Sequence, residues 1–284
     1  MERKIILADS AGFCFGANRG YKAVEDSIND NKPIYTFGPI LNNTKIVEGF
    51  AEKGVKVVND INEFSSLEKG KIIIRSHGVS KEKYEAILAT GFEVFDATCP
   101  FVKRIHRIVE KQSQLGDRIV VIGNPVHPEV EGIVGWSVNG ADVIENLEEA
   151  SAFLAKEGEN ITIVSQTTFN RKKFEELVDI FAKNSYNINV MNTICDATAI
   201  RQEEADRLSS ICEVMIVIGD KLSSNSRKLY EICQSKCKMT YFVETVDDLK
   251  GILDQSVESI GITAGASTPK YIIEEVQNYV RNDF

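Results

Sequence analysis

Short apolar runs alternate with amphipathic stretches along the whole chain. The apolar runs have the length of buried strands, and the stretches between them carry helical periodicity. We expect strands at 4–8, 34–37, 55–58, 118–123 and 213–219, and helices at 17–30, 101–115 and 197–210. Strands that alternate with helices in this way usually form parallel sheets, so the pattern predicts an α/β fold.

The alternation is organised as a repeat. Three times a cysteine closes an apolar stretch, and a glycine in a turn follows it at a fixed distance. The pairs are Cys14–Gly38, Cys99–Gly123 and Cys195–Gly219, and the offsets 38 − 14, 123 − 99 and 219 − 195 are all 24. Three equal offsets indicate three copies of one α/β unit, each placing one thiolate at a common centre.

The repeat also predicts the domain organisation. We expect three pseudo-threefold-related α/β domains, each with a small, mainly parallel sheet, at 14–97, 98–193 and 194–284. The third unit has no strand-plus-cysteine at its own end. The N-terminal segment 1–13 supplies that piece if the three units close in a ring.

Composition narrows the classes of function. The 284 residues are 43% hydrophobic and 26% charged, which is ordinary for a globular protein. A net charge of −9 argues against non-specific nucleic-acid binding, which needs a basic face. No apolar run approaches the roughly 20 residues of a membrane helix, and the N-terminus carries no secretory cleavage site. Six cysteines without a framework-like spacing favour a reducing, cytoplasmic setting.

Cys14, Cys99 and Cys195 occupy equivalent positions and are considered as one set. Buried packing is one interpretation. A zinc ion on three thiolates is another, although structural zinc usually has four ligands with two in close pairs. A 4Fe–4S cluster normally takes four thiolates, so three would leave one iron open to a substrate oxygen. The residues alone favour iron–sulfur only modestly over zinc.

Four further residues carry no expected chemistry. Cys212 starts a strand of core type, and Cys233 and Cys237 share a helix face at i, i+4. We interpret all three as core or surface residues. His106 lies in a helical stretch and is expected to have a surface or packing role.

Polar loops follow the strands at symmetric positions. The residues 28 positions after the three cysteines are Asn42, His127 and Ser223, because 42 − 14, 127 − 99 and 223 − 195 are all 28. A second loop in each unit contributes His77, Thr167 with Thr168, and Ser267. The consecutive residues Ser223, Ser224 and Asn225 open a helix. Such weakly charged donors suit a diphosphate or another multi-oxygen anion held by helix N-termini. For any one loop taken alone, ordinary helix capping is the better explanation, whereas six loops at symmetric positions favour a ligand.

Glu129 stands two residues after His127, in HPEVEG. A carboxyl group in a mostly neutral pocket is a good proton donor if burial raises its pKa. The alternative is a first-turn glutamate that complements a helix dipole, and Glu131 fits that role at least as well.

The motifs GFCFG, RSHGVS, FDATCP, HPEVEG, SQTT, SSNS and TAGAS, in this order, resemble the 4-hydroxy-3-methylbut-2-enyl diphosphate reductase family. The resemblance covers essentially the whole chain. It implies a trefoil of three α/β domains around a central 4Fe–4S cluster on three cysteines. The implied activity is a two-electron, two-proton reductive removal of an allylic hydroxyl, which yields isopentenyl and dimethylallyl diphosphates. The implied electron donor is ferredoxin or flavodoxin.

The resemblance also implies roles for individual residues. The cluster ligands would be Cys14, Cys99 and Cys195, and the open iron would take the substrate hydroxyl. Glu129 would supply the proton, and Thr167 would hold the hydroxyl or a water in the relay. The diphosphate would be held by His77, His127, Ser223, Ser224, Asn225 and Ser267.

One position departs from the family pattern. The first loop of the family ends in a His-Asn pair, whereas this chain has Asn42-Asn43. Asparagine donates to a phosphate oxygen but cannot carry positive charge. We therefore expect weaker substrate binding or altered proton delivery, worth about 1–2 kcal/mol for one charge-assisted hydrogen bond. The alternatives are a related iron–sulfur reductase or dehydratase for a different allylic or anionic substrate, and a cluster-bearing sensor without turnover.

Overall fold

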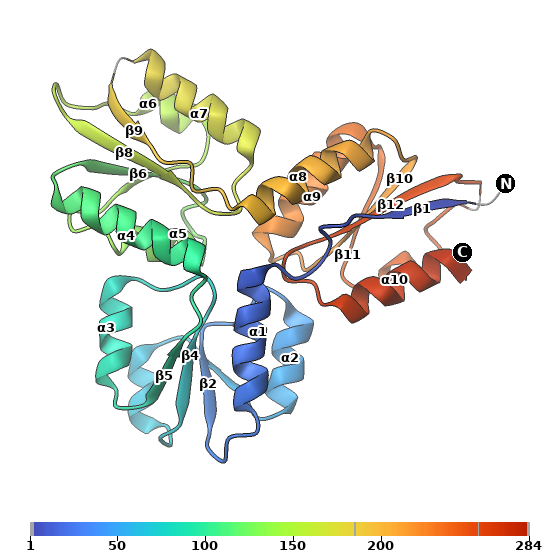
Figure 1. Ribbon diagram of the computed structural model, residues 1–284, viewed down its shortest axis with the longest axis horizontal. Coiled ribbons are helices and arrows are strands. Elements are labelled where there is room, and N and C mark those ends of the chain that lie inside the picture. Colours follow the sequence, from blue (N-terminus) through green and yellow to red (C-terminus); the bar gives the residue numbers. More distant parts are fainter. Residues whose placement is uncertain (1–2, 185, 255, 283–284) are drawn as a thin grey trace. The chain divides into compact units, whose positions relative to one another are not determined.

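The computed structural model describes residues 3–184, 186–254 and 256–282. Within these residues the strands form three four-stranded sheets, and every strand pairing in them is parallel (Figure 1). The strand orders are β3-β2-β4-β5, β7-β6-β8-β9 and β1-β12-β10-β11. The predicted α/β fold with three small parallel sheets is confirmed.

The strands are short, as the apolar runs predicted. The first sheet contains β2 (Ile34–Phe37), β3 (Lys56–Val58), β4 (Lys71–Ile74) and β5 (Glu93–Asp96). The second contains β6 (Arg118–Ile122), β7 (Asp142–Ile144), β8 (Asn160–Ser165) and β9 (Asn187–Val190). The third contains β1 (Lys4–Leu7), β10 (Val214–Ile218), β11 (Met239–Val243) and β12 (Ser259–Ala264).

Two sets of helices cover the two faces of each sheet. In the first sheet, α1 (Phe15–Ser27) and α2 (Thr44–Glu52) cover one face, and η1 (Ile61–Ser66) and α3 (Lys81–Ala89) cover the other. In the second sheet, the corresponding pairs are α4 (Pro100–Gln114) with α5 (Pro128–Val134), and α6 (Leu147–Ala152) with α7 (Arg171–Lys183). In the third sheet, they are α8 (Asp196–Ser209) with α9 (Ser224–Lys236), and η2 (Val246–Leu249) with α10 (Lys270–Asn282).

Alternate residues of the strands explain this double covering. In β10, Val214, Ile216 and Ile218 pack with α10, whereas Met215 and Val217 pack with α8 and α9. Successive strand side chains point to opposite faces, so an uninterrupted apolar strand needs helices on both sides.

The N-terminal strand completes the third sheet. β1 pairs with β12 in the register Lys4↔Ser259 to Leu7↔Ile262. The two strands lie side by side in Figure 1. β1 therefore takes the edge position that β5 and β9 take in the other two sheets.

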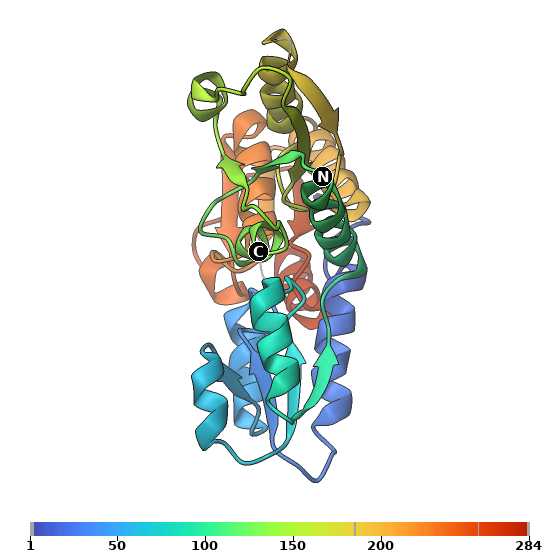
Figure 2. The same ribbon diagram turned by 90° about the vertical axis from the view of Figure 1, so that its left-hand side faces the viewer.

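The chain divides into two compact units. The small unit comprises Met1–Asn18, Asn42–Ile46 and Asp196–Phe284, and the large unit comprises Arg19–Leu41 and Val47–Cys195. The large unit thus contains two of the sheets, whose helices and strands are coloured blue to yellow (Figure 2). The three-domain division at 14–97, 98–193 and 194–284 stays a prediction, and its outermost residues 1–2 and 283–284 lie outside the described residues.

The segment HPEVEG is interpreted from the sequence as part of a polar loop, with a first helical turn at Glu129 and Glu131 as the alternative. The structure has the helix, because residues 128–134 form α5 with both glutamates in its first turn. Pro128 occupies the first helical turn, where its missing N–H costs nothing, and the imidazole of His127 accepts the N–H of Glu129 as a helix cap. Histidine is an uncommon cap, so the usual Ser, Thr, Asp or Asn signal is absent.

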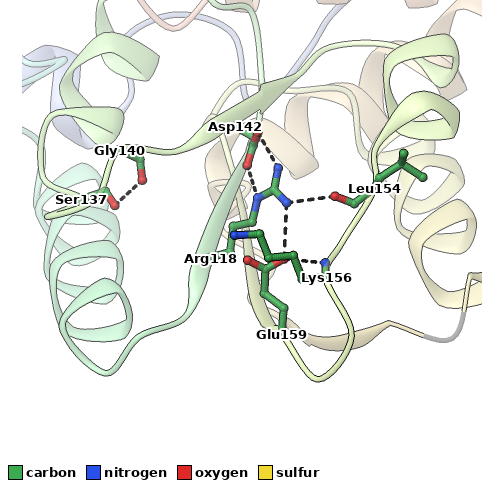
Figure 3. Close-up of polar contacts among 7 residues, drawn as sticks. All are labelled: Arg118, Ser137, Gly140, Asp142, Leu154, Lys156 and Glu159. Carbon is green, nitrogen blue, oxygen red and sulfur yellow. Dashed lines mark hydrogen bonds and ion pairs between the residues drawn. The ribbon is translucent and has the colours of Figure 1, made fainter.

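The amino ends of the second sheet's strands carry a network of charged groups (Figure 3). Arg118 donates to both carboxylate oxygens of Asp142 at 2.7 and 3.0 Å, and to the carbonyl of Leu154 at 2.9 Å. Its guanidinium also contacts Glu159 at 3.3 Å. This network lies at the end of the sheet opposite to the polar loops.

In the described part of the chain, no helix is both long enough and apolar enough to cross a membrane.

Candidate functional site

Each of the three equivalent cysteines stands directly before a helix. Cys14 precedes α1, Cys99 precedes α4 and Cys195 precedes α8. The free N–H groups and the dipole at a helix N-terminus favour negative charge close to them. In α1, the backbone N–H of Ala17 points at Cys14 Sγ at 3.4 Å. Each of the three sulfur-bearing residues thus lies at the N-terminus of a helix.

The backbone of each cysteine is tied to a polar loop of the same kind. The N–H of Cys14 donates to the carbonyl of Ala266 at 3.2 Å, just before Ser267. The N–H of Cys99 donates to Ser76 at 2.9 Å, just before His77, and that of Cys195 donates to Thr167 at 3.1 Å. Each sulfur-bearing residue thus adjoins one of the loops from which the sequence predicted ligand contacts.

The cysteines form two distinct groups. All six are free; Cys14, Cys99 and Cys195 are half-buried, whereas Cys212, Cys233 and Cys237 are buried. Burial raises the pKa of Cys212, and it raises the pKa of Cys233 to about 12, so these two thiols stay protonated. The latter three pack in the core around α8 and α9, within the roles expected for them.

The first group fits an iron–sulfur centre by its chemistry. Half-buried sulfurs at helix N-termini, with a backbone N–H aimed at one of them, are suitable thiolate ligands. Cys14 belongs to the small unit, and Cys99 and Cys195 belong to the large unit. Over the residues that the structure describes, no three His, Cys, Asp or Glu side chains gather as a metal site.

In the large unit, Glu129 and Thr167 form a buried pair. The N–H of Thr167 donates to Glu129 Oε1 at 2.6 Å, and its hydroxyl donates to Oε2 at 2.8 Å. Glu129 is only 2% exposed. Burial raises the pKa of its carboxyl to about 7, although both hydrogen bonds from Thr167 act in the opposite direction. A carboxyl that binds a proton near neutral pH can serve as a general acid.

Two imidazoles lie beside this pair in the same unit. The rings of His77 and His127 meet edge to face, with centroids 5.3 Å apart. His127 Nδ1 accepts the N–H of Glu129 at 3.1 Å, so a neutral His127 carries its proton on Nε2. Loss of solvation lowers the pKa of His77 well below its ordinary value, helped by the proximity of His127 and Arg75. The Nδ1 atom of His77 is buried without a hydrogen-bond partner among the described residues.

In the small unit, hydroxyl and amide groups gather at the start of α9. Ser223 caps the helix and accepts the N–H of Ser226 at 3.4 Å, and Ser224 is the first helical residue. The hydroxyl of Ser267 lies 3.4 Å from that of Ser223. Asn225 is 4% exposed, and neither its amide nitrogen nor its amide oxygen has a partner among the described residues. A buried amide without partners at a helix N-terminus indicates a place for a hydrogen-bonding ligand.

The first polar loop differs in detail from the expectation. Asn42 is half-buried, and its carbonyl accepts the Ser267 hydroxyl at 3.1 Å. The residue that caps α2 is the next one: Asn43 Oδ1 accepts the N–H of Ile46 at 3.1 Å, and Nδ2 donates to the Ser267 carbonyl at 3.0 Å. In the other two repeats, the cap is the residue 28 positions after the cysteine. The first repeat is therefore longer by one residue at this point.

Asp220 and Asn43 are structurally important residues that the sequence analysis missed. Asp220 Oδ2 accepts both the N–H and the hydroxyl of Thr44 at 2.7 Å, and Oδ1 accepts the N–H of Leu222 at 2.7 Å. Asp220 thereby holds the start of α2 against the loop that leads to α9. The only available signal was an Asp directly after Gly219, a common turn pattern that does not reveal a partner 176 residues away.

His106 has the packing role that was one of its two expected roles. It is 4% exposed and stacks on Trp136 with ring centroids 5.1 Å apart. Burial lowers the pKa of its imidazole to about 4. Trp136 in turn donates from Nε1 to the carbonyl of Val79 at 2.9 Å, two residues after His77.

These features describe an α/β protein in which cysteines at helix starts accompany a buried carboxyl with a raised pKa and loops rich in hydroxyl, amide and imidazole groups. The chain belongs to the LytB protein family, whose model matches residues 5–281. The resemblance drawn from the motifs is confirmed.

Curated relatives and solved structures agree with this assignment. A relative from Caldanaerobacter subterraneus, named 4-hydroxy-3-methylbut-2-enyl diphosphate reductase, is 42% identical over 98% of this chain and 97% of its own length. A relative of the same name from Clostridioides difficile is 40% identical over 98% of this chain and 99% of its own length.

Two solved structures share the fold. The E-1-hydroxy-2-methyl-but-2-enyl-4-diphosphate reductase from Plasmodium falciparum matches with a TM-score of 0.91 and 26% identity, covering 99% of this chain and 87% of that one. A structure of (E)-4-hydroxy-3-methyl-but-2-enyl diphosphate reductase, described as the terminal enzyme of the non-mevalonate pathway, matches with a TM-score of 0.71 and 39% identity. It covers 98% of this chain and 99% of that one.

Proposed function

We propose that this protein is a reductase of (E)-4-hydroxy-3-methylbut-2-enyl diphosphate that forms isopentenyl and dimethylallyl diphosphates. Full-length similarity to reductases of that name supports the substrate. In the reaction, the allylic C–O bond breaks and the oxygen leaves as water. One new C–H bond forms, and two electrons and two protons are consumed.

The observation that carries the proposal is the Glu129–Thr167 pair. With a pKa of about 7, Glu129 holds a proton in roughly half of the molecules at neutral pH. A protonated Glu129 donates to Thr167 Oγ1, which frees the Thr167 hydroxyl hydrogen for the leaving oxygen. Thr167 thus orients the substrate hydroxyl and passes on the proton, and Glu129 is the acid. Among alternatives, a sensor without turnover has no need for such a group.

In this proposal, polar loops of both units form hydrogen bonds with the diphosphate. In the small unit, Ser223, Ser224, Asn225 and Ser267 supply neutral donors, and Asn42 adds an amide. In the large unit, His77 and His127 add imidazole N–H groups. Their contribution is local hydrogen bonding, which offsets the unfavourable field of a chain with a net charge of −9.

We assign Cys14, Cys99 and Cys195 as the ligands of a 4Fe–4S cluster with one open iron. When bound, the cluster supplies electrons one at a time together with Lewis acidity. A ferredoxin or flavodoxin is the electron donor in this proposal. The six free cysteines agree with a reducing, cytoplasmic setting.

An anaerobic turnover assay tests the function. The full-length protein, reconstituted with iron and sulfide, is mixed with a chemical reductant and the hydroxylated diphosphate. We expect isopentenyl and dimethylallyl diphosphates as products. A protein that holds its iron–sulfur centre and yields neither product would contradict the proposal.

Asn42 supports one alternative, a related allylic diphosphate as the preferred substrate. Asparagine replaces the histidine of the family pattern in a loop that contacts Ser267. Comparing kcat/KM for several hydroxylated allylic diphosphates decides between the two. A tenfold preference for another substrate would favour the alternative.

A further inference from the structure

Glu204 of α8 holds the segment that leads to Cys14. One carboxylate oxygen accepts the N–H of Asp9 at 2.9 Å, and the other accepts the N–H and hydroxyl of Ser10 at 2.9 and 2.6 Å. These partners lie 194 and 195 residues away in the sequence. The carboxylate therefore fixes the course of the chain four to five residues before the sulfur.

Arg201 holds the same segment one helical turn away. It is 5% exposed and donates from Nη2 to the carbonyl of Gly12 and from Nη1 to the carbonyl of Ala197, both at 2.7 Å. Gly12 has φ = 97°, in the left-handed region that favours glycine, and lies two residues before Cys14. The arginine fork thus joins the first turn of α8 to a specially shaped turn beside the sulfur.

Arg19 makes the corresponding contact in the first repeat. It belongs to α1 and donates from Nη1 to the carbonyl of Thr98 at 3.2 Å and from Nη2 to that of Asp96 at 3.1 Å. These carbonyls stand one and three residues before Cys99. Its guanidinium also lies 5.3 Å from the centre of the Phe95 ring.

The two arginines occupy matching places in the repeat. Arg19 follows Cys14 by 19 − 14 = 5 residues, and Arg201 follows Cys195 by 201 − 195 = 6. Each arginine lies on the helix that starts at one cysteine and grips the loop that leads to the next one. In the second repeat, Arg104 at 104 − 99 = 5 is exposed.

The loop before Cys195 is held differently. The hydroxyl of Thr193 donates to the carbonyl of Ser165 and accepts its N–H, both at 2.7 Å. The second repeat therefore holds this loop through neutral hydrogen bonds, whereas the other two use charged side chains. We call these charged contacts, made by Arg19 and by Arg201 with Glu204, the clasp. Arg104 offers a matched position in which an arginine does not perform this role.

We propose that Arg19 and the Arg201–Glu204 pair are positioning residues that hold the Cys99 and Cys14 loops in the conformation needed to retain the iron–sulfur centre. The proposal rests on the proposed function, because it takes these cysteines as cluster ligands. Fork-shaped contacts to backbone carbonyls fix both position and direction, which a single donor cannot do.

The rate of iron release to a chelator tests this role in the full-length, anaerobically reconstituted protein. We expect Arg19→Met and Arg201→Met to release iron about tenfold faster than the wild type, the effect of losing a charge-assisted hydrogen bond. Arg201→Lys should recover part of the difference, since one ammonium reaches one of the two carbonyls. Glu204→Gln should give a smaller increase, because the amide keeps an acceptor oxygen.

Two further variants are matched controls, one on α4 and one on α8. Arg104→Met and Glu203→Gln alter exposed residues at neighbouring or equivalent positions and should leave iron release unchanged. The electron paramagnetic resonance spectrum of the reduced protein should broaden or shift in the clasp variants only. That readout separates positioning from general destabilisation, which is followed by the melting temperature.

The outcomes are distinct. Iron release from Arg19→Met and Arg201→Met within twofold of that from Arg104→Met, with unchanged spectra, would overturn the proposal. A wild-type protein that takes up no iron would overturn both this proposal and the function. A protein that holds iron and does not reduce the diphosphate would overturn the function alone, and the clasp comparison would still be decided.

Discussion

The candidate polar-loop residues of the large unit include ionisable side chains, whereas those of the small unit are serines and asparagines. The large unit contains His77, His127 and Glu129, and all three histidines of the chain fall within it. The corresponding positions of the small unit hold serine and asparagine. The same α/β repeat thus carries two kinds of chemistry, set by side chains at equivalent strand ends.

This difference between the two units indicates which of them can supply a proton and which can only form hydrogen bonds. Burial raises the pKa of Glu129 and lowers that of His77, so both are mainly neutral at or just below pH 7. A neutral acid can give up a proton, and a neutral imidazole can donate a hydrogen bond. The hydroxyls and amides of the small unit can only donate and accept hydrogen bonds. We therefore propose that only the large unit supplies a proton, whereas the small unit contributes hydrogen bonds to the anion alone.

The largest effect on activity is expected when the proton donor of the large unit, Glu129, is removed. We expect Glu129→Gln to lower kcat by about 100-fold or more, the usual contribution of a general acid, with little change in KM. In the wild type, kcat should fall as the pH rises through about 7, where Glu129 loses its proton. Steady-state kinetics over a pH series measures both effects.

Glu131 provides the matched control for that experiment. It lies two residues further along α5, is exposed, and forms an ion pair with Lys83. Glu131→Gln should retain kcat. An equal loss of kcat in both variants would remove Glu129 from its assigned role.

The same carboxyl predicts a pH-dependent stability. The folded-state pKa of Glu129 is about 7, above its ordinary 4.5, so the folded protein binds the proton more tightly. Stability is therefore lost as the pH rises from about 4.5 through 7, by up to about 3 kcal/mol. Glu129→Gln keeps an oxygen that accepts the Thr167 N–H, and its NH2 group can donate to the Thr167 hydroxyl oxygen, so it should remove this loss. Denaturant unfolding at pH 5 and pH 8 measures the difference, and equal pH dependence in both proteins would contradict the assignment.

The sequence predicted the framework well because its signals are local. β2 has the predicted bounds, 34–37, because an apolar run ends at Gly38-Pro39. Ser80 is of a residue type that commonly caps helices, and its hydroxyl accepts the N–H of Lys83 at 3.3 Å. Helix α5 was considered only as an alternative, because its cap is His127 and its one clear marker, Pro128, also suits a loop.

The remaining features depend on contacts between distant segments. Asn43 was passed over because the count of 28 residues pointed to Asn42, whereas the capping hydrogen bond identifies the next residue. The clasp between Arg201 and Gly12 joins residues 189 positions apart, which no local pattern reports. The roles of the candidate site residues stay predictions, and the experiments proposed for them are the test.

In the small unit, Asn225 should affect binding without affecting stability. Its buried amide has no partner in the described structure, so Asn225→Ala removes an unsatisfied group and should leave the free energy of unfolding unchanged or higher. Loss of a hydrogen bond to the diphosphate should raise KM about tenfold. Gln234→Ala, at an exposed position of the same helix, is the control. Lower stability with an unchanged KM would show that the amide serves packing alone.

Asn42→His would place a histidine among the described site residues of the small unit. The two units would then differ less in their ionisable side chains. A protonated imidazole should improve diphosphate binding by about 1–2 kcal/mol, roughly tenfold in KM. The gain should appear below about pH 6.5 and fade above it, because only the cation adds charge. Kinetics at pH 6 and pH 8 measure this. An unchanged turnover and Michaelis constant at both pH values would reject a role for the substitution.

The smallest effect on activity is expected from Arg118, at the amino ends of the strands of the second sheet. Arg118 anchors the amino ends of β6 and β7 through Asp142 (Figure 3). Its guanidinium also packs over the ring of Phe153 at 4.4 Å. Arg118→Met should lower the free energy of unfolding by about 1–2 kcal/mol, since a half-exposed bidentate pair and its ring contact are lost. Because the polar loops lie at the carboxyl ends of the strands, kcat and KM should stay at wild-type values. A large loss of kcat with intact folding would mean that the two ends of this sheet are coupled and that the division of roles by strand end is wrong.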